Sequence, residues 1–335
     1  KPVPPGSAVK LFDSFITSIA EMGIKAFIIS GNHDSAERLS FGSNIMKSEG
    51  IYFSQVYEGH TEPIILNDEY GRVSVYLLPF LKPAQVRPFF PDMPVETYED
   101  AVLAAVSEAH VNESMRSIIV SHQFVTGAVT SDSEERSVGG LDNISAAVYE
   151  KFDYAALGHI HKPQSLSGGR VRYCGTPLKY SFSEAEHKKT VTVVDMKEKG
   201  NTDITEIPLS PLHDLRIIRG TYMELTASSA YTEGNKEDYI RAVLTDENEI
   251  NCAIGKLRAV YPNIMQVMYD NTRTNTLFHV SETRSDESKS PLELIMDFYK
   301  LQNGAEMSSR QLEITKELLE ITSARKNDKK ETEKQ

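Results

Sequence analysis

The sequence predicts an α/β fold with a smaller appended module, and three apolar segments that each end in polar residues support this prediction. The segment "KAFIIS" runs into "GNHD" at residues 31–34, "SIIVSH" ends at His122, and "DYAALGHIH" ends at His161. Each is a continuous apolar run of the kind that forms a buried strand. Helical patterns precede the first two, and this alternation is typical of a sheet flanked by helices.

Local patterns predict most of the other elements. A helix is expected over residues 7–22, with Phe12 and Phe15 on its apolar stripe. Residues 63–80 alternate around polar residues near 67–71, which predicts a β-hairpin. From about Leu212 the character changes to a separate small α/β module, in which we expect a polar helix around residues 238–245.

The C-terminal part is expected to hold a linker, two helices and a tail. Residues 281–289 are almost free of apolar side chains and predict a linker. Ser290 with Glu293, and Ser308 with Gln311, have the spacing of capping boxes at the starts of two helices. We therefore expect a helix-loop-helix over residues 290–323 and a disordered tail over residues 324–335.

Composition limits the class of protein. The 335 residues carry a net charge of −12, which argues against nonspecific, charge-driven binding to nucleic acid, although a bound metal cluster would offset it. No apolar run approaches the ~18 residues of a transmembrane helix, and the first residues lack the apolar core of a signal peptide. The only cysteines, Cys174 and Cys252, are predicted to be buried thiols in a reducing compartment.

The polar strand ends predict a metal site. In open α/β sheets, ligands bind beyond the carboxyl ends of the strands. His159 and His161 are two residues apart and would point to the same side of an extended segment, and Gly158 allows close backbone approach. Asparagine and histidine without thiolate suit Mn, Fe or Zn. Taken singly, each histidine could be a hydrogen-bonded core residue, and Asn-His-Asp could be a simple turn.

These motifs resemble those of a known superfamily. "GNHD", a single histidine after a strand, and "GHIH" are similar to the later motifs of the calcineurin-like metallophosphoesterases. The segments "SDSEERSVGGLDNISAAVYEKFDYAALGHIHKPQ", "YCGTPLKYSFSEAEHKKTVTVVDM" and "PLHDLRIIRGTYMEL" resemble the bacterial SbcD nuclease subunits, up to about Thr322. The resemblance implies a metallophosphoesterase β-sandwich flanked by helices over residues 1–210 and a capping domain over residues 211–280.

The resemblance also implies the site residues. The family binds two divalent metal ions, with manganese the expected metal. The ligands expected for one ion are Asn32, His122 and His159. His161 is similar to a ligand of the other ion, His33 matches the catalytic histidine, and Asp34 is expected to orient its neighbours within the catalytic group.

Two motifs of the family, D-x-H and G-D-x-x-D, do not occur in this sequence. In the family they supply further ligands, including an aspartate that bridges both ions. We therefore expect a nuclease domain that is truncated at its N-terminus, just after the second motif. Without the bridging carboxylate the chain should bind at most one metal weakly and should be inactive, or nearly so, on its own.

The helix-loop-helix is expected to bind the coiled coil of an SbcC-type ATPase, as the resemblance implies. Its apolar residues cover more of each helix than a surface helix needs, although the pair could instead pack on the protein's own core. The expected contact residues are Leu292, Ile295, Phe298, Tyr299, Leu312, Leu318 and Leu319.

The resemblance implies a component of an ATP-regulated DNA exonuclease and endonuclease that cleaves double-strand ends and hairpins in DNA repair, recombination and replication. It would bind double-stranded DNA, form a homodimer and be cytoplasmic and nucleoid-associated, without membrane contact. Two alternatives stay open. One is a metallophosphoesterase that acts on small phosphomonoesters or cyclic nucleotides. The other is a non-catalytic scaffold, in view of the missing aspartates.

Overall fold

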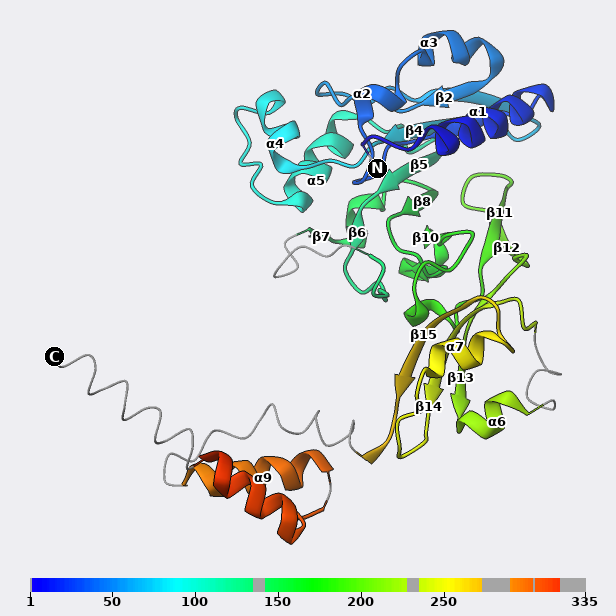
Figure 1. The fold of residues 1–335 in the computed structure, drawn as a ribbon. Helices are drawn as coiled ribbons and strands as arrows, with labels where there is room; N and C mark the ends of the chain where they lie inside the picture. Colours follow the sequence, from blue (N-terminus) through cyan, green and yellow to red (C-terminus); the bar gives the residue numbers. More distant parts are fainter. Residues whose placement is uncertain (1, 135–141, 228–234, 273–289, 304, 320–335) are drawn as a thin grey trace. The chain divides into compact units, whose positions relative to one another are not determined.

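The computed structural model describes residues 2–134, 142–227, 235–272, 290–303 and 305–319. The chain forms two compact units, Lys1–Leu212 and His213–Gln335 (Figure 1). The predicted linker over residues 281–289 and the predicted tail over residues 324–335 lie outside the described residues.

A six-stranded sheet forms the centre of the first unit and confirms the α/β prediction. Its strand order is β3-β4-β5-β8-β10-β9, with β4, β5, β8 and β10 parallel and the edge strands β3 and β9 antiparallel to their neighbours. The predicted hairpin is confirmed as β3 and β4. The strands are β3 Ile64–Asp68, β4 Gly71–Leu78, β5 Arg116–His122, β8 Tyr154–Gly158, β9 Gln164–Leu166 and β10 Val171–Tyr173.

Three short strand pairs complete the first unit. The pairs β1–β2 and β6–β7 are parallel, and β11–β12 is antiparallel. The carbonyl of Ser30, just after β1, accepts a hydrogen bond of 2.9 Å from the amide of Phe80, just after β4. This bond brings the loop after β1 to the carboxyl end of the large sheet. The strands are β1 Ala26–Ile28, β2 Ile51–Phe53, β6 Phe124–Val125, β7 Asn143–Ile144, β11 Thr190–Met196 and β12 Thr202–Pro208.

The helix α5 covers the core of the first unit. It begins with a capping box in which Thr97 and Asp100 each accept a hydrogen bond from the other's backbone amide. Its small residues, including Ala101 and Ala105, are fully buried in the main apolar cluster and allow close packing. The helices of this unit are α1 Gly6–Glu21, α2 Ala36–Leu39, α3 Ser43–Met46, α4 Pro83–Val86 and α5 Tyr98–Glu108.

The predicted N-terminal helix is present as α1, but its apolar stripe is largely exposed. All sixteen residues of α1 are described and none is buried. Phe12, Phe15 and Met22 are 39%, 58% and 70% exposed. Phe12 touches the ring of Phe53 in β2 edge-on, with ring centroids 6.4 Å apart. The helix therefore contacts β2, while much of its apolar surface faces outward.

The second unit contains a parallel three-stranded sheet in the order β13-β14-β15. The predicted helix around residues 238–245 is wrong, because these residues form the central strand. Ile240, Ala242 and Leu244 are fully buried at every second position, which is the period of a strand. The elements are β13 Leu215–Gly220, α6 Tyr222–Thr226, β14 Tyr239–Leu244, α7 Ala253–Arg258 and β15 Ile264–Tyr269.

Both predicted C-terminal helices are present, as α9 Pro291–Asn303 and as helical residues 309–319. Their capping boxes are confirmed. The amide of Ser290 donates to Glu293 Oε2 at 2.7 Å, and the amide of Ser308 donates to Gln311 Oε1 at 2.9 Å. The helices contact each other through Gln311, whose Nε2 donates to the hydroxyl of Tyr299 at 2.9 Å.

Two further predictions concern single residues and membrane contact. The prediction of buried thiols is wrong, since Cys174 and Cys252 are both exposed. Cys174 follows the short strand β10 and Cys252 precedes α7, so both fall at element ends rather than in the core. Across the described ranges, no helix has the length and apolar character needed to cross a membrane.

Replacing Ile119 with alanine should strongly destabilise the first unit. Ile119 lies in β5 between β4 and β8 and is 2% exposed, so truncation leaves a cavity between strands. We expect the free energy of unfolding to fall by about 2–5 kcal/mol, measured by urea denaturation with circular dichroism. Leu103→Ala on α5, where the side chain is 41% exposed, is the matched control and should change it by less than ~0.5 kcal/mol.

Candidate metal centre

Three strand ends bring the predicted site residues together. Asn32 and His33 lie in the turn that follows β1, and His122 is the last residue of β5. His159 and His161 follow β8. The strands β5 and β8 are adjacent and parallel, so their carboxyl ends meet at the same edge of the sheet.

All five of these residues line one cavity of about 230 Å³. Asp34, the sixth predicted residue, does not line it. Of the other residues of the wall, the sequence analysis singled out only Gly158, and it missed the carboxylate Glu134. The complete lining is Asn32, His33, His122, Glu134, Gly158, His159, Ile160, His161, Gly175 and Thr176.

The imidazole of His122 fits between two glycine backbones. In the register of the sheet His122 pairs with Gly158, and a Cβ added to Gly158 would lie 2.7 Å from His122 Nδ1. A Cβ added to Gly31 would lie 2.8 Å from His122 Cε1. Both distances are shorter than real carbon contacts, so only glycine at both positions leaves room for the ring.

His122 and Asn32 have the spacing of two ligands of one ion. His122 Nε2 lies 3.1 Å from Asn32 Oδ1, a hydrogen-bond distance in the metal-free chain. Two ligand atoms that are each about 2.1 Å from an ion and at right angles to each other are about 3 Å apart. The pair therefore fits a small divalent ion, which would replace the hydrogen bond.

The histidines are held in the neutral form that binds metal. Burial lowers the pKa of His122 to about 3, and repulsion from His159, His33 and His161 contributes to the same shift. Burial also lowers the pKa of His159. Both imidazoles therefore stay neutral across the physiological range, with one ring nitrogen free to bind a cation.

His159 is fixed in a strained backbone conformation. Its φ of 98° lies in the left-handed region that residues with a side chain rarely adopt. Its ring stacks on Phe80, with centroids 6.5 Å apart and planes 7° apart, and meets His122 edge-on at 5.3 Å. The ring centroid of Phe124 lies 6.0 Å from that of His159. These aromatic contacts fix the direction of the imidazole.

Asp34 and Glu134 stabilise the backbone around the site. Asp34 Oδ2 accepts a hydrogen bond of 2.9 Å from the amide of Gly31, which closes the turn and agrees with an orienting role. Glu134 Oε1 accepts from the amide of His161 at 2.7 Å, and its Oε2 accepts from the hydroxyl of Ser131 at 2.7 Å. Both oxygens of Glu134 are therefore already used as acceptors.

A buried carboxylate, Glu184, lies behind His161. Burial alone would raise the pKa of Glu184, but hydrogen bonds from Lys189, Ser133 and His161 outweigh it and lower the pKa to about 2. Glu184 is therefore ionised at neutral pH. The sequence reasoning did not single it out, because its segment carries no ligand spacing.

The site is poor in negative charge. Among the residues that the structure describes, no group of three or more His, Cys, Asp or Glu side chains is arranged to hold a metal ion. The cluster of Asn32, His122 and His159 contains two histidines and an amide, and none of these carries a negative charge. This arrangement suits one ion better than two.

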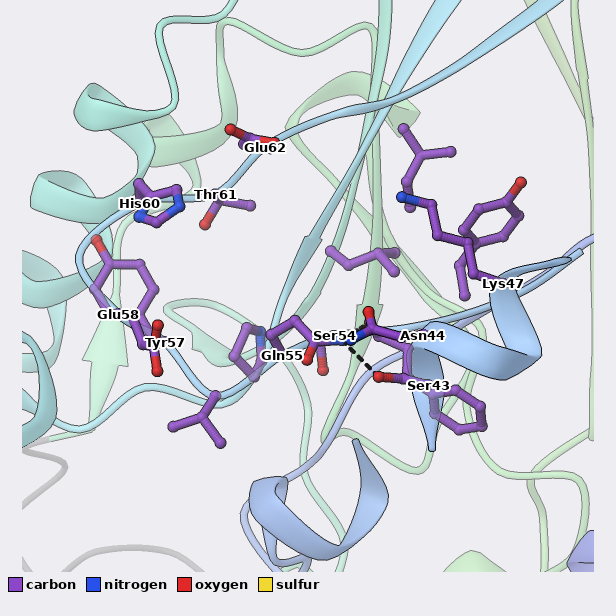
Figure 2. A pocket seen from close by; sticks show the side chains of 16 residues that line it. Ser43, Asn44, Lys47, Ser54, Gln55, Tyr57, Glu58, His60, Thr61 and Glu62 are labelled. Atoms are coloured by element: carbon purple, nitrogen blue, oxygen red, sulfur yellow. Dashed lines mark hydrogen bonds between the residues drawn. The ribbon is translucent and has the colours of Figure 1, made fainter. Parts of the chain in front are cut away.

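A second, larger pocket lies away from these strand ends. Its volume is about 320 Å³, and Figure 2 shows Lys47 on one side of it and His60 on the other. Gln55 Nε2 donates to Ser43 Oγ at 3.0 Å inside it. Of the residues predicted for the site, none is among the described residues that line this pocket. The chemistry is therefore assigned to the smaller cavity.

The fold and the site define the class of protein: an α/β protein with asparagine and histidine side chains gathered beyond the carboxyl ends of its strands. A Staphylococcus epidermidis protein, described as the D subunit of the nuclease SbcCD, is 30% identical over 323 residues, which cover 94% of this chain and 83% of that protein. Residues 211–303 match the family model SbcD_C, described as the type 5 capsule protein repressor C-terminal domain. The chain belongs to the family of SbcD nuclease subunits.

Replacing Gly158 with alanine should displace His122. The new Cβ would overlap the ring, while the backbone of Gly158 itself needs no positive φ, so the effect comes from the contact alone. We expect a crystal structure of the variant to show His122 moved away from Asn32, with unfolding easier by about 1–3 kcal/mol. Gly6→Ala, with open space around the position, is the control. An unmoved His122 would contradict the prediction.

Proposed function

We propose that the chain is the nuclease component of an SbcCD-type complex that cleaves phosphodiester bonds at DNA ends and hairpins in repair and recombination. The observation that supports this most strongly is the meeting of five predicted site residues in one cavity at three strand ends. Membership of the SbcD family supports a nuclease by descent. The same membership supports a cytoplasmic role at bacterial DNA.

In the proposed mechanism Asn32, His122 and His159 would hold a divalent metal ion, for which manganese is the leading candidate, and His161 would serve a second position. When bound, the metal supplies a site for the phosphate and a more acidic water. His33 lines the same cavity and is placed by this proposal near the leaving oxygen, where an imidazole can donate a proton.

A Mn²⁺ titration of the purified chain should give at most one weakly bound ion. Two divalent ions about 4 Å apart repel with roughly four times the energy of two unit charges, and the proposed ligands Asn32, His122 and His159 carry no negative charge against this. The count and affinity can be measured by electron paramagnetic resonance of free Mn²⁺. His159→Ala should abolish the binding, and two tightly bound ions would refute the prediction.

The decisive assay for the function is cleavage of a DNA hairpin in Mn²⁺ by the chain together with its coiled-coil ATPase. We expect His33→Ala to lower cleavage at least ~100-fold, because it removes a proton donor from the cavity. Complex formation should be unaffected, because the proposed contacts with the ATPase lie in the C-terminal helices. The chain alone should show little or no cleavage. Robust cleavage by the chain alone would contradict that part of the proposal.

The two alternatives predict different results in the same assay. A non-catalytic scaffold would form the complex and bind DNA without cleavage under any metal, and the low charge of the site keeps this candidate open. A small-molecule phosphoesterase would hydrolyse phosphomonoesters or cyclic nucleotides without the ATPase. The second unit, with its own apolar core, argues against that alternative because small substrates do not need it.

For the ATPase, we propose that the C-terminal helix pair is the docking site. Of the residues predicted to contact it, Phe298 and Leu318 are 58% and 59% exposed. The others are partly buried: Leu292, Ile295, Tyr299, Leu312 and Leu319. Leu294, Met296 and Ile314, on the same two helices, are 40–42% exposed and extend the apolar surface.

Replacing Phe298 and Leu318 with glutamate should weaken binding to the coiled coil at least ~10-fold, because each charge would have to be buried against an apolar partner. Isothermal titration calorimetry with the coiled-coil segment measures this. Lys316→Glu, at an exposed position of the same helix, is the control for added negative charge. Equal weakening by the control would mean that charge, not apolar contact, governs binding.

Homodimer formation is part of the same proposal. The exposed apolar residues of α1, among them Leu11 at 74% and Phe15 at 58%, support an additional protein contact on the first unit.

A further inference from the structure

His161 Nδ1, on the side of the ring that meets the loop before β7, contacts two oxygen atoms of the protein. Ser133 Oγ lies 2.7 Å from Nδ1 and Glu184 Oε1 lies 3.2 Å from it. Ser133 Oγ also donates a hydrogen bond to the same Glu184 oxygen. The side chain of Glu184 is completely buried, while that of His161 is 20% exposed.

These contacts determine which ring nitrogen of His161 carries the proton. An ionised carboxylate can only accept hydrogen bonds. The hydroxyl of Ser133 has a single hydrogen and gives it to Glu184, so towards His161 it can also only accept. Both partners of Nδ1 are therefore acceptors, and the proton must lie on Nδ1. In the neutral ring, Nε2 is then left with a free lone pair at the cavity that His161 lines.

Glu184 is itself held in place by Lys189. Lys189 Nζ donates to Glu184 Oε2 at 2.5 Å, to Thr176 Oγ1 at 2.9 Å and to the carbonyl of His161 at 2.9 Å. Lys189 is 4% exposed at its side chain, so the ion pair is buried on both sides. One ammonium group thus fixes both the carboxylate behind the ring and the backbone that carries the ring.

We propose that Glu184, together with Ser133 and Lys189, is a positioning residue that fixes His161 as the Nδ1–H tautomer and directs Nε2 to the metal position. The proposal rests on the proposed function, since it names what prepares one of the ligands. Carboxylates that accept from the outer nitrogen of a metal-binding histidine typically raise metal affinity 10–100-fold. The loop 131–134 and the segment 182–189 thereby contribute to the site, although neither supplies a proposed metal ligand.

The test is the protonation state of His161 in the metal-free chain, read from the imidazole ¹⁵N shifts by two-dimensional NMR near pH 7.5. The His161 signals are assigned by their loss in His161→Gln. We expect Nδ1–H in the wild type. In Glu184→Gln the amide can donate as well as accept, so the Nε2–H tautomer should appear.

The matched control is Glu186→Gln, an exposed glutamate two residues away, which should leave the tautomer unchanged. Ser133→Ala keeps the Glu184–Lys189 ion pair and should keep Nδ1–H through the direct contact. An Nε2–H tautomer in the wild type overturns the proposal, and so does a Glu184→Gln variant with an unchanged tautomer.

The test of Glu184 and the test of the proposed function can fail independently of each other. The NMR result needs no metal, so a wild type that binds no Mn²⁺ would refute the metal centre while the tautomer still decides the role of Glu184. If Glu184→Gln fails to fold, the wild-type tautomer and Ser133→Ala carry the test alone.

Discussion

The site depends on a single packing constraint, the space for the His122 ring between the backbones of Gly31 and Gly158. A Cβ at either glycine would come within 2.8 Å of the ring. The two glycines follow β1 and end β8, and His122 ends β5, so the contact joins three strand ends. Because the ring can fill only this space, its Nε2 is directed at Asn32. His159 then packs edge-on against the fixed His122 ring.

Buried charged side chains surround His161, whereas the proposed metal ligands inside the cavity are uncharged. Glu184 and Lys189 form a buried ion pair behind the ring, and Glu134 uses both oxygens to hold the backbone. Buried pairs of this kind contribute more to a defined geometry than to net stability, because desolvation offsets much of their attraction. As a result, the direction of the His161 imidazole is strongly determined. The described residues offer no cluster of ligands that could hold two cations.

Sequence patterns placed five of the six predicted site residues at one cavity, but they misassigned a strand outside it. Parallel strands share a carboxyl edge, so Asn32, His122 and His159 could be placed together from their positions after apolar runs. The strand β14 was predicted as a helix, and only its pairing with β13 and β15 makes it a strand. Glu184 could not be found, since only the tertiary fold brings it to a histidine 23 residues earlier.

By itself the sequence predicted the α/β class, the capping boxes of the C-terminal helices and the set of side chains that we propose as metal ligands. These follow from local periodicity and from residue types at strand ends, which need no long-range information. Only the tertiary structure decided which ring nitrogen of His161 is free, which carboxylates support the backbone, and that the apolar stripe of α1 is exposed. Hydrogen-bond partners and burial depend on contacts between distant segments, and a pattern along one segment does not contain them.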